Sequence, residues 1–319
     1  MSETTPPTSL TVVAPFFNEG AHVVAFLARL EAVLAQLGVA WTVICVNDGS
    51  SDDTLALLLA AHEREPRIKV IDLSRNFGKA SALTAGLDHC RTEAVALLNS
   101  DLQHPPEFLA EMFGKCREGF DDVYAFPQGN GDAGFAERLS RKIGRAARGY
   151  APELRLPQEG GGDFRLLSAA AVAAIRRLPE RARFMPGLYH WVGFRQVGLP
   201  YAASASRAKR RRRGLLRTTA LAIEGISAFS NLPLRIWGAV GAIIAALSLL
   251  YGLARILRHL IHGADVPGYE SIIVAVLFLG GVQLLSLCIL GGYIGRIFNE
   301  VKGRPLYIVR GTYGLDRRD

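Results

Sequence analysis

The sequence is poor in cysteine, and its few cysteines are not spaced like a metal site or a disulfide framework. The chain of 319 residues has four, Cys45, Cys90, Cys116 and Cys288, and no pair has the Cys-x-x-Cys spacing. Cys45 and Cys90 stand in apolar surroundings, which is typical of small core residues. We therefore expect neither a zinc site nor structural disulfides, and a reducing compartment fits this composition.

The amino terminus lacks the apolar core of a secretory signal. It begins MSETTPPTSL, which is polar almost throughout. We therefore expect roughly the first 200 residues to stay in the cytoplasm.

Charged residues are absent from two long apolar stretches near the carboxyl end, Ile236–Ala254 and Ile272–Gly295. Each is long enough to cross about 30 Å of hydrocarbon at about 1.5 Å per residue. The sequence therefore predicts two transmembrane helices, with a buried helical hairpin as the alternative.

The net charge of +8 is concentrated in one place, SRAKRRRRG, which carries six bases between Arg207 and Arg213. Nucleic acid is one partner for such a run. Its position shortly before the first apolar stretch favours anionic lipid headgroups instead, at about 1 kcal/mol per base. Bases also follow the second stretch, which predicts that both ends of the chain face the cytoplasm. We expect a membrane surface and no nucleic acid as partner.

These features divide the chain into four expected segments. Residues 1–205 form a cytosolic domain, 206–233 a basic and amphipathic segment on the membrane surface, 234–297 the two membrane helices, and 298–319 a cytosolic tail.

Strand-like and helix-like patterns alternate over the first 125 residues. Buried strands are predicted at 10–16, 41–48, 68–74, 94–101 and 123–126, and amphipathic helices lie between them. This alternation predicts an α/β fold with a parallel sheet covered by helices on both faces. Later in the chain we expect helices at 135–148, 168–178 and 215–229, a short strand entered by QEGGGDFRLL, and a strand at 195–201.

Polar residues collect where the predicted strands end, in Pro15–Glu19, Asn47–Ser51, Ser74–Lys79 and Asn99–Gln103. Ligands of such sheets bind at the carboxyl ends of the strands. NDGSSDD can bond a base or a ribose, or can simply form a turn and a helix cap. Arg75 and Lys79 can hold phosphates, or can be solvated.

The stretch AVALLNSDLQHPPE places oxygen-bearing side chains at Asn99, Asp101 and Gln103, so they point the same way if the chain stays extended. Such oxygens suit a hard cation such as Mg²⁺ that is shared with substrate phosphates. Together, the strand ends predict a site for a nucleoside diphosphate.

The whole series of motifs resembles the polyprenyl-phosphate glycosyltransferases of the GT-A type, family 2, and in particular their bacterial membrane-anchored branch, which acts on undecaprenyl phosphate. The motifs that carry the resemblance are VVAPFFNE, VNDGSSDDT, LSRNFGKASALTAGLDH, DLQHPPE, GDFRLLS, RLPERARFMPGLYHWVGFRQVGLPY and LGGYIGRIFNEVKGRPLYIV.

The resemblance implies a GT-A domain followed by membrane helices, and transfer of a sugar with inversion from a nucleotide-sugar to polyprenyl phosphate at the cytoplasmic face of the inner membrane. It favours a UDP-sugar over a GDP-sugar, Mg²⁺ or Mn²⁺ as cofactor, and homo-oligomers such as tetramers. It implies donor-binding roles for one set of residues: Pro15, Phe17, Glu19, Asn47, Asp48, Lys79 and Asp101. Asn99, Asp101 and Gln103 match metal ligands, and Asp163 and Asp101 match catalytic positions. The acceptor phosphate is expected at Arg165, Arg207, Arg211 and Arg212.

Two positions depart from the family pattern by exchanging an acid for an amide. Asn47 precedes Asp48 where two acids are usual, and Asn99-Ser100-Asp101 replaces Asp-x-Asp. An amide oxygen coordinates Mg²⁺ without adding charge, so we expect the metal to be bound more weakly. This leaves three functions open: an active transferase, a weakened or inactive nucleotide-binding scaffold, and a transferase for another lipid acceptor such as a diacylglycerol or a hopanoid.

Overall fold

The computed structural model describes residues 7–101, 104–128, 162–181, 183–202 and 269–315, and seven positions between 241 and 254. The chain divides into two compact units, of which one comprises Met1–Gly225 with Pro305–Asp319 and the other Ile226–Arg304. Several predictions lie outside the described residues. They concern Gln103, Arg207, Arg211, Arg212, the helices at 135–148 and 215–229, and most of the apolar stretch 236–254.

The first half of the chain alternates strands and helices as its pattern predicts. The described elements of the first unit are β1 (Ser9–Phe16), α1 (Gly20–Gln36), β2 (Ala40–Asn47), α2 (Thr54–Arg64), β3 (Ile68–Leu73), α3 (Lys79–His89), β4 (Ala94–Leu97), the 3₁₀ turn η1 (Pro106–Phe108), α4 (Leu109–Arg117), β5 (Asp122–Gln128), β6 (Arg165–Ser168), α6 (Ala169–Arg176), α7 (Met185–Trp191), β7 (Gln196–Ala202) and β8 (Val309–Tyr313).

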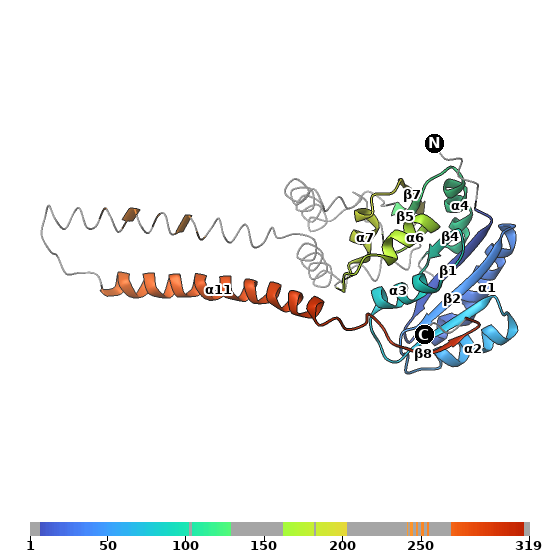
Figure 1. Cartoon of the computed structure of the whole chain (residues 1–319), viewed down its shortest axis with the longest axis horizontal. Coiled ribbons are helices and arrows are strands. Elements are labelled where there is room, and N and C mark those ends of the chain that lie inside the picture. Colours follow the sequence, from blue (N-terminus) through green and yellow to red (C-terminus); the bar gives the residue numbers. More distant parts are fainter. Residues whose placement is uncertain are drawn as a thin grey trace, which may run out of the picture. The chain divides into compact units, whose positions relative to one another are not determined.

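These strands form one sheet in the order β7-β5-β6-β4-β1-β2-β3-β8 (Figure 1). The pairs β1–β2, β1–β4, β2–β3 and β5–β7 are parallel, whereas β6 and β8 run antiparallel to their neighbours. The expected α/β fold with a mostly parallel sheet is therefore confirmed. The carboxyl ends of β1, β2, β3 and β4 meet at one edge of the sheet, because parallel strands end on the same side.

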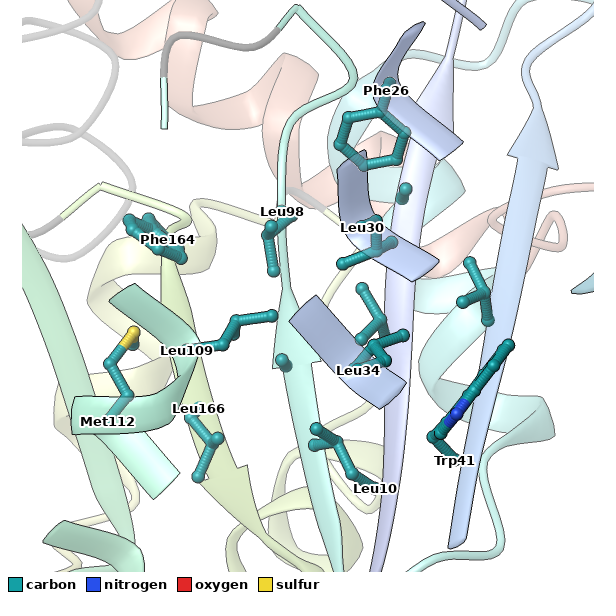
Figure 2. Packing of buried hydrophobic residues seen from close by; sticks show 14 of the residues in the cluster. Leu10, Phe26, Leu30, Leu34, Trp41, Leu98, Leu109, Met112, Phe164 and Leu166 are labelled. Atoms are coloured by element: carbon teal, nitrogen blue, oxygen red, sulfur yellow. The ribbon is translucent and has the colours of Figure 1, made fainter. Parts of the chain in front are cut away.

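Each face of the sheet is covered by helices, because successive side chains of a strand point to opposite faces. Leu10, Val12 and Phe16 belong to the core cluster with residues of α1, α2 and α4. Figure 2 shows this packing around Leu30, Leu34 and Leu109.

Helix α3 packs against the other face of β1, on the side of Val13. A Cβ atom at Gly86 would lie 2.2 Å from Cγ1 of Val13, so this closeness of helix and strand requires glycine.

The tail of the chain adds the edge strand β8 to this sheet, which the sequence did not reveal. β8 pairs with β3, placing Val70 opposite Tyr313 and Ile71 opposite Thr312. The backbone N–H of Ser74 donates to the carbonyl of Ile308 at 2.9 Å, and the hydroxyl of Tyr307 donates to Asp88 on α3 at 2.8 Å. Residues 305–315 thus belong to the same folded unit as the first 200 residues.

The second unit contains the helix α11 (Tyr269–Val301). Its stretch Phe278–Val301 contains an 18-residue window with a mean hydropathy of 1.7. Within the described part of the chain, it is the one helix long and apolar enough to cross a membrane. Its large apolar side chains, such as Leu284, Leu287 and Phe298, are exposed. The helix overlaps the predicted second span. The predicted first span falls mostly outside the described residues, so the count of two spans stays a prediction.

Candidate functional site

The loops after β1 and β2 are bonded to each other and form one wall of the candidate site. Asn18 has a positive φ of 54°, and its Oδ1 accepts a hydrogen bond from the backbone N–H of Ser51 at 2.8 Å. The backbone N–H of Asn18 donates to Oγ of Ser50, and that of Glu19 donates to Oγ1 of Thr54, each at 3.0 Å. The neighbouring side chain of Phe17 is 45 % exposed, so its ring is accessible to a planar ligand such as a base.

Asp48 joins this wall to the loop that follows β3. Its carboxylate accepts hydrogen bonds from the backbone N–H groups of Phe77 and Gly78, at 2.7 and 3.0 Å. Burial raises the pKa of Asp48, and the two backbone donors and Arg75 oppose that rise without cancelling it. Asp48 therefore fixes the loop that precedes α3, whose first residue is Lys79.

Gly49 allows this close approach of the two loops. Its φ is +64°, and a Cβ atom there would lie 2.3 Å from the carbonyl carbon of Arg75. Glycine is therefore required at this turn.

Asn47 is buried at the end of β2, and its amide is matched to a carboxylate. Nδ2 of Asn47 donates to Oδ1 of Asp72 at 2.7 Å, and its Oδ1 accepts from the backbone N–H of Ser50 at 3.3 Å. An aspartate at position 47 would place one carboxylate against another, which is unfavourable in a buried environment. The amide is therefore the residue type that this contact requires.

The second amide, Asn99, has an equally specific partner. Its Nδ2 lies 3.1 Å from Nε2 of His104, and Nδ1 of His104 lies 3.0 Å from the hydroxyl of Tyr201. With the amide as donor, Nε2 of His104 accepts, and its Nδ1 carries the proton toward Tyr201. His104 packs against Phe164, with ring centroids 4.9 Å apart. The amide group is held so that Oδ1 of Asn99 is buried and has no hydrogen-bond partner among the described residues.

Asp163 and Lys79 meet at the same edge as an ion pair. β6 pairs with β4 so that Arg165 faces Leu97. This pairing ends at Leu97 and Arg165, so Asn99 follows the end of β4 by two residues and Asp163 precedes the start of β6 by two residues at the same edge. Like Oδ1 of Asn99, Oδ1 of Asp163 is buried without a hydrogen-bond partner in the described part of the chain.

The expected contact of Arg165 with the acceptor phosphate requires a correction, because this side chain is buried in the protein and is not accessible to a ligand. The side chain of Arg165 is completely buried, and NH1 donates to Oδ2 of Asp122 at 2.5 Å. Nε donates to the carbonyl of Gly162 at 3.1 Å, and the guanidinium lies 4.6 Å from the ring centroid of Tyr189. Burial raises the pKa of Asp122 to about 6, against the opposing effect of Arg165. A contact between Arg165 and the acceptor phosphate needs an exposed guanidinium, which this packing excludes.

The oxygens at the edge fit a hard cation that is shared with a ligand. Within the described residues, no three His, Cys, Asp or Glu side chains converge as a closed metal site. The buried, unpartnered oxygens of Asn99 and Asp163 remain, and Asp101 follows Asn99 by two residues. Mg²⁺ and Mn²⁺ prefer such carboxylate and amide oxygens, and Mg²⁺ commonly takes its other ligands from substrate phosphates and water.

Three site residues were not found from the sequence. His104 and Tyr201 hold Asn99, and Tyr189 is fully buried beside Arg165, with a hydroxyl that has no partner among the described residues. Burial raises the pKa of Tyr189 well above its ordinary value. The motif DLQHPPE and the block around Tyr189 were both recognised as family motifs, but neither spacing reveals a contact across the sheet.

Comparison with known proteins identifies the family. Residues 11–174 match the model described as Glycosyl transferase family 2, and residues 232–297 match the one described as GtrB C-terminal hairpin. An uncharacterized glycosyltransferase of Synechocystis sp. is 42 % identical, with 96 % of each chain covered. A bactoprenol glucosyl transferase of Shigella phage SfII is 37 % identical, with 95 % of this chain and 98 % of that protein covered.

A solved structure has the same fold. Glucosyl-3-phosphoglycerate synthase from Mycobacterium tuberculosis, in complex with Mn²⁺, uridine diphosphate and glucosyl-3-phosphoglycerate, matches with a TM-score of 0.50 and 20 % identity, covering 70 % of this chain and 80 % of that chain. At this identity the match supports the fold alone. The family model, which covers half of the chain, and the full-length relatives together show that this protein belongs to glycosyltransferase family 2.

Proposed function

We propose that this protein transfers a sugar from a nucleotide-sugar, with a UDP-sugar favoured over a GDP-sugar, to the phosphate of a membrane polyprenol. The observation that carries the proposal is the ion pair of Lys79 and Asp163 at the sheet edge where β4 also ends near Asn99, in a chain whose full-length relatives include bactoprenol glucosyl transferases. That edge offers a cation, a carboxylate and an unpaired amide oxygen, which suit a diphosphate and its sugar.

Each group has a distinct role in this reaction. The wall of Pro15, Phe17, Glu19 and Asp48 receives the base and ribose, and Lys79 neutralises charge on the diphosphate. An oxygen of the acceptor phosphate attacks the anomeric carbon, and the bond from that carbon to the diphosphate oxygen breaks with its electron pair on the leaving group. Since the acceptor phosphate is already an anion, Asp163 serves mainly to orient the sugar and acceptor, and little proton removal is needed.

A divalent cation fits beside these residues. Asn99, Asp101 and Asp163 would hold it through their oxygens, and Gln103, outside the described residues, is a further ligand by sequence. When bound, the cation would supply positive charge to the departing diphosphate. The neutral amide at position 99 favours weaker binding than an Asp-x-Asp pair, so the donor's own phosphates would contribute more of the affinity.

The position of β8 supports the proposed membrane topology. Residues Pro305–Asp319 lie in the same unit as Met1–Gly225. A chain that leaves and re-enters a unit on one side of a membrane must cross it an even number of times. If Phe278–Val301 is one crossing, the segment before α11 must supply another. This supports two membrane helices, anchoring a cytoplasmic catalytic domain at the plasma membrane.

The basic run is the proposed binding region for the acceptor phosphate. Arg207, Arg211 and Arg212 lie in sequence between the catalytic domain and the first predicted span. Guanidinium groups pair with phosphates through two parallel hydrogen bonds, so these residues suit the acceptor phosphate as well as anionic headgroups. An oligomeric assembly such as a tetramer is part of the same proposal.

The alternative of an inactive scaffold is disfavoured by the two amides. Asn47 and Asn99 each donate to a specific acceptor, Asp72 and His104. Substitutions that merely accumulate after loss of function have no reason to acquire matched partners. The site therefore fits an active transferase with altered metal binding better than an inactive one.

The test is transfer of radiolabelled sugar from UDP- and GDP-sugars to undecaprenyl phosphate by the purified full-length protein, with and without Mg²⁺ or Mn²⁺. We expect lipid-soluble product that depends on the acceptor, lost in Asp163→Asn and retained in the surface variant Glu107→Gln. Diacylglycerol in place of polyprenyl phosphate tests the other acceptor class. No product from any donor under any of these conditions would contradict the proposal.

A further inference from the structure

The last strand of the chain touches the loop that carries the donor-site cations. NH2 of Arg310, on β8, donates to the carbonyl of Ser74 at 2.7 Å, and the backbone N–H of Ser74 donates to the carbonyl of Ile308. Ser74 begins the loop whose Phe77 and Gly78 amides bind Asp48. The tail therefore holds the first residue of this loop, and Asp48 holds its end.

A second set of contacts leads from Arg310 to the wall formed by the loops after β1 and β2. NH1 of Arg310 lies 3.6 Å from Oδ2 of Asp72, whose side chain is only 3 % exposed. Oδ1 of Asp72 accepts from Asn47, and Oδ1 of Asn47 accepts from the N–H of Ser50. Ser50 in turn binds Asn18 in the loop after β1. The Arg310–Asp72–Asn47 relay thus reaches the wall beside Phe17.

We propose that β8 is part of the scaffold of the donor site and that Arg310 is a positioning residue for the nucleotide. Arg310 acts through Asp72 and Asn47, and it provides the positive charge beside an otherwise buried carboxylate. Without it, the buried carboxylate of Asp72 keeps its hydrogen bond from Asn47 but loses the nearby positive charge of Arg310, and both loops lose a fixed partner. This inference rests on the proposed function, since it assigns the loops to a nucleotide.

The tail provides its own matched control. Tyr307 anchors the same segment to α3 through Asp88, outside the Arg310–Asp72–Asn47 relay. Tyr307→Phe removes one tail contact while leaving Arg310 and Asp72 unchanged. Arg310→Ala removes both the contact to the relay and the bond to the carbonyl of Ser74, and Tyr307 still anchors the segment to α3.

The experiment measures UDP binding by calorimetry on the full-length protein in detergent, together with initial rates. For Arg310→Ala we expect UDP affinity to fall by roughly three- to tenfold, with the donor KM rising by the same factor and kcat and the acceptor KM nearly unchanged. Tyr307→Phe should lower Tm about as much as Arg310→Ala does, but it should leave UDP affinity within about twofold of wild type. In an Asp72→Asn background, Arg310→Ala should cost less affinity than in the wild type, because only the bond to Ser74 is then left to lose.

The outcomes separate the two proposals. Equal loss of UDP affinity in Arg310→Ala and Tyr307→Phe, or undiminished loss in the Asp72→Asn background, would overturn the positioning role alone. UDP binding by Arg310→Ala as tight as that of wild type would do the same. A wild-type protein that binds neither UDP nor GDP would overturn the proposed function, and the inference with it.

Discussion

Asn47 and Asp72 are both buried, and the amide of the first donates to the carboxylate of the second at 2.7 Å. This contact suits an amide at position 47, where the family resemblance led us to expect an acid. Asn99 and His104 repeat the arrangement at the end of β4. In both places the amide donates a hydrogen bond to a neighbouring acceptor, which an ionised carboxylate could not do.

Replacing Asn47 with aspartate should therefore destabilise the protein. Two buried carboxylates would face each other at hydrogen-bond distance, so one must take up a proton or move away. We expect the free energy of unfolding to fall by about 2–4 kcal/mol, measured by chemical denaturation. The exposed Asn76→Asp is the matched control and should change it by less than about 0.5 kcal/mol. Equal stability of the two variants would contradict this account.

Replacing Asn99 with aspartate should separate metal binding from local stability. The variant adds negative charge at the edge, so affinity for Mn²⁺ in the presence of UDP should rise by about fivefold or more, measured by electron paramagnetic resonance. The lost donor to His104 should lower stability by about 1 kcal/mol. Asn99→Ala should lose both the metal oxygen and the donor. Unchanged Mn²⁺ affinity in both variants would exclude position 99 as a ligand.

Lys79 and Asp163 should matter for activity far more than for folding. Lys79 is 44 % exposed at its side chain, so Lys79→Met should change stability by less than about 1 kcal/mol. The donor KM should rise by about tenfold or more, and Asp163→Asn should lower kcat by at least about 100-fold. Lys115→Met, which breaks the exposed pair with Glu118, is the control. The assignment fails if Asp163→Asn retains full kcat.

Asp48 should contribute to binding and little to stability. Its pKa is raised in the folded protein, so the folded state binds this proton more tightly than the unfolded chain does. The titration of Asp48 therefore favours folding at low pH, below the ordinary pKa of an aspartate, and this contribution is lost as pH rises through the raised value. Asp48→Ala at pH 7 should cost no more than about 1 kcal/mol of stability, yet weaken UDP binding by about tenfold or more. Titration calorimetry and thermal unfolding of the same sample measure both, and a large loss of Tm without loss of affinity would contradict this prediction.

The buried pair of Arg165 and Asp122 should be a large structural contributor. Asp122→Asn leaves a completely buried guanidinium without its carboxylate, which costs about 3–5 kcal/mol. Glu107→Gln breaks the exposed pair with Arg29 and should cost at most about 1 kcal/mol. Chemical denaturation of the two variants compares these costs directly, and similar values would show that burial does not decide them.

The amino-acid sequence by itself determined the alternation of strands and helices and the edge where the site lies. These follow from local periodicity and from turn residues, and both are readable within short windows. Lys79 and Asn99 were named from such windows and Asp163 from the family resemblance, and the structure brings Lys79 and Asp163 into contact.

Tertiary structure alone decided which groups the site residues meet. Asn47 and Asp72, His104 and Tyr201, and Arg165 and Asp122 are far apart in the chain and come together only through strand order and packing. The same holds for β8, a strand that follows the apolar helix α11 in sequence yet completes the sheet beside β3. Local patterns carry no information on such pairings, because a side chain's burial and partners depend on which strands become neighbours.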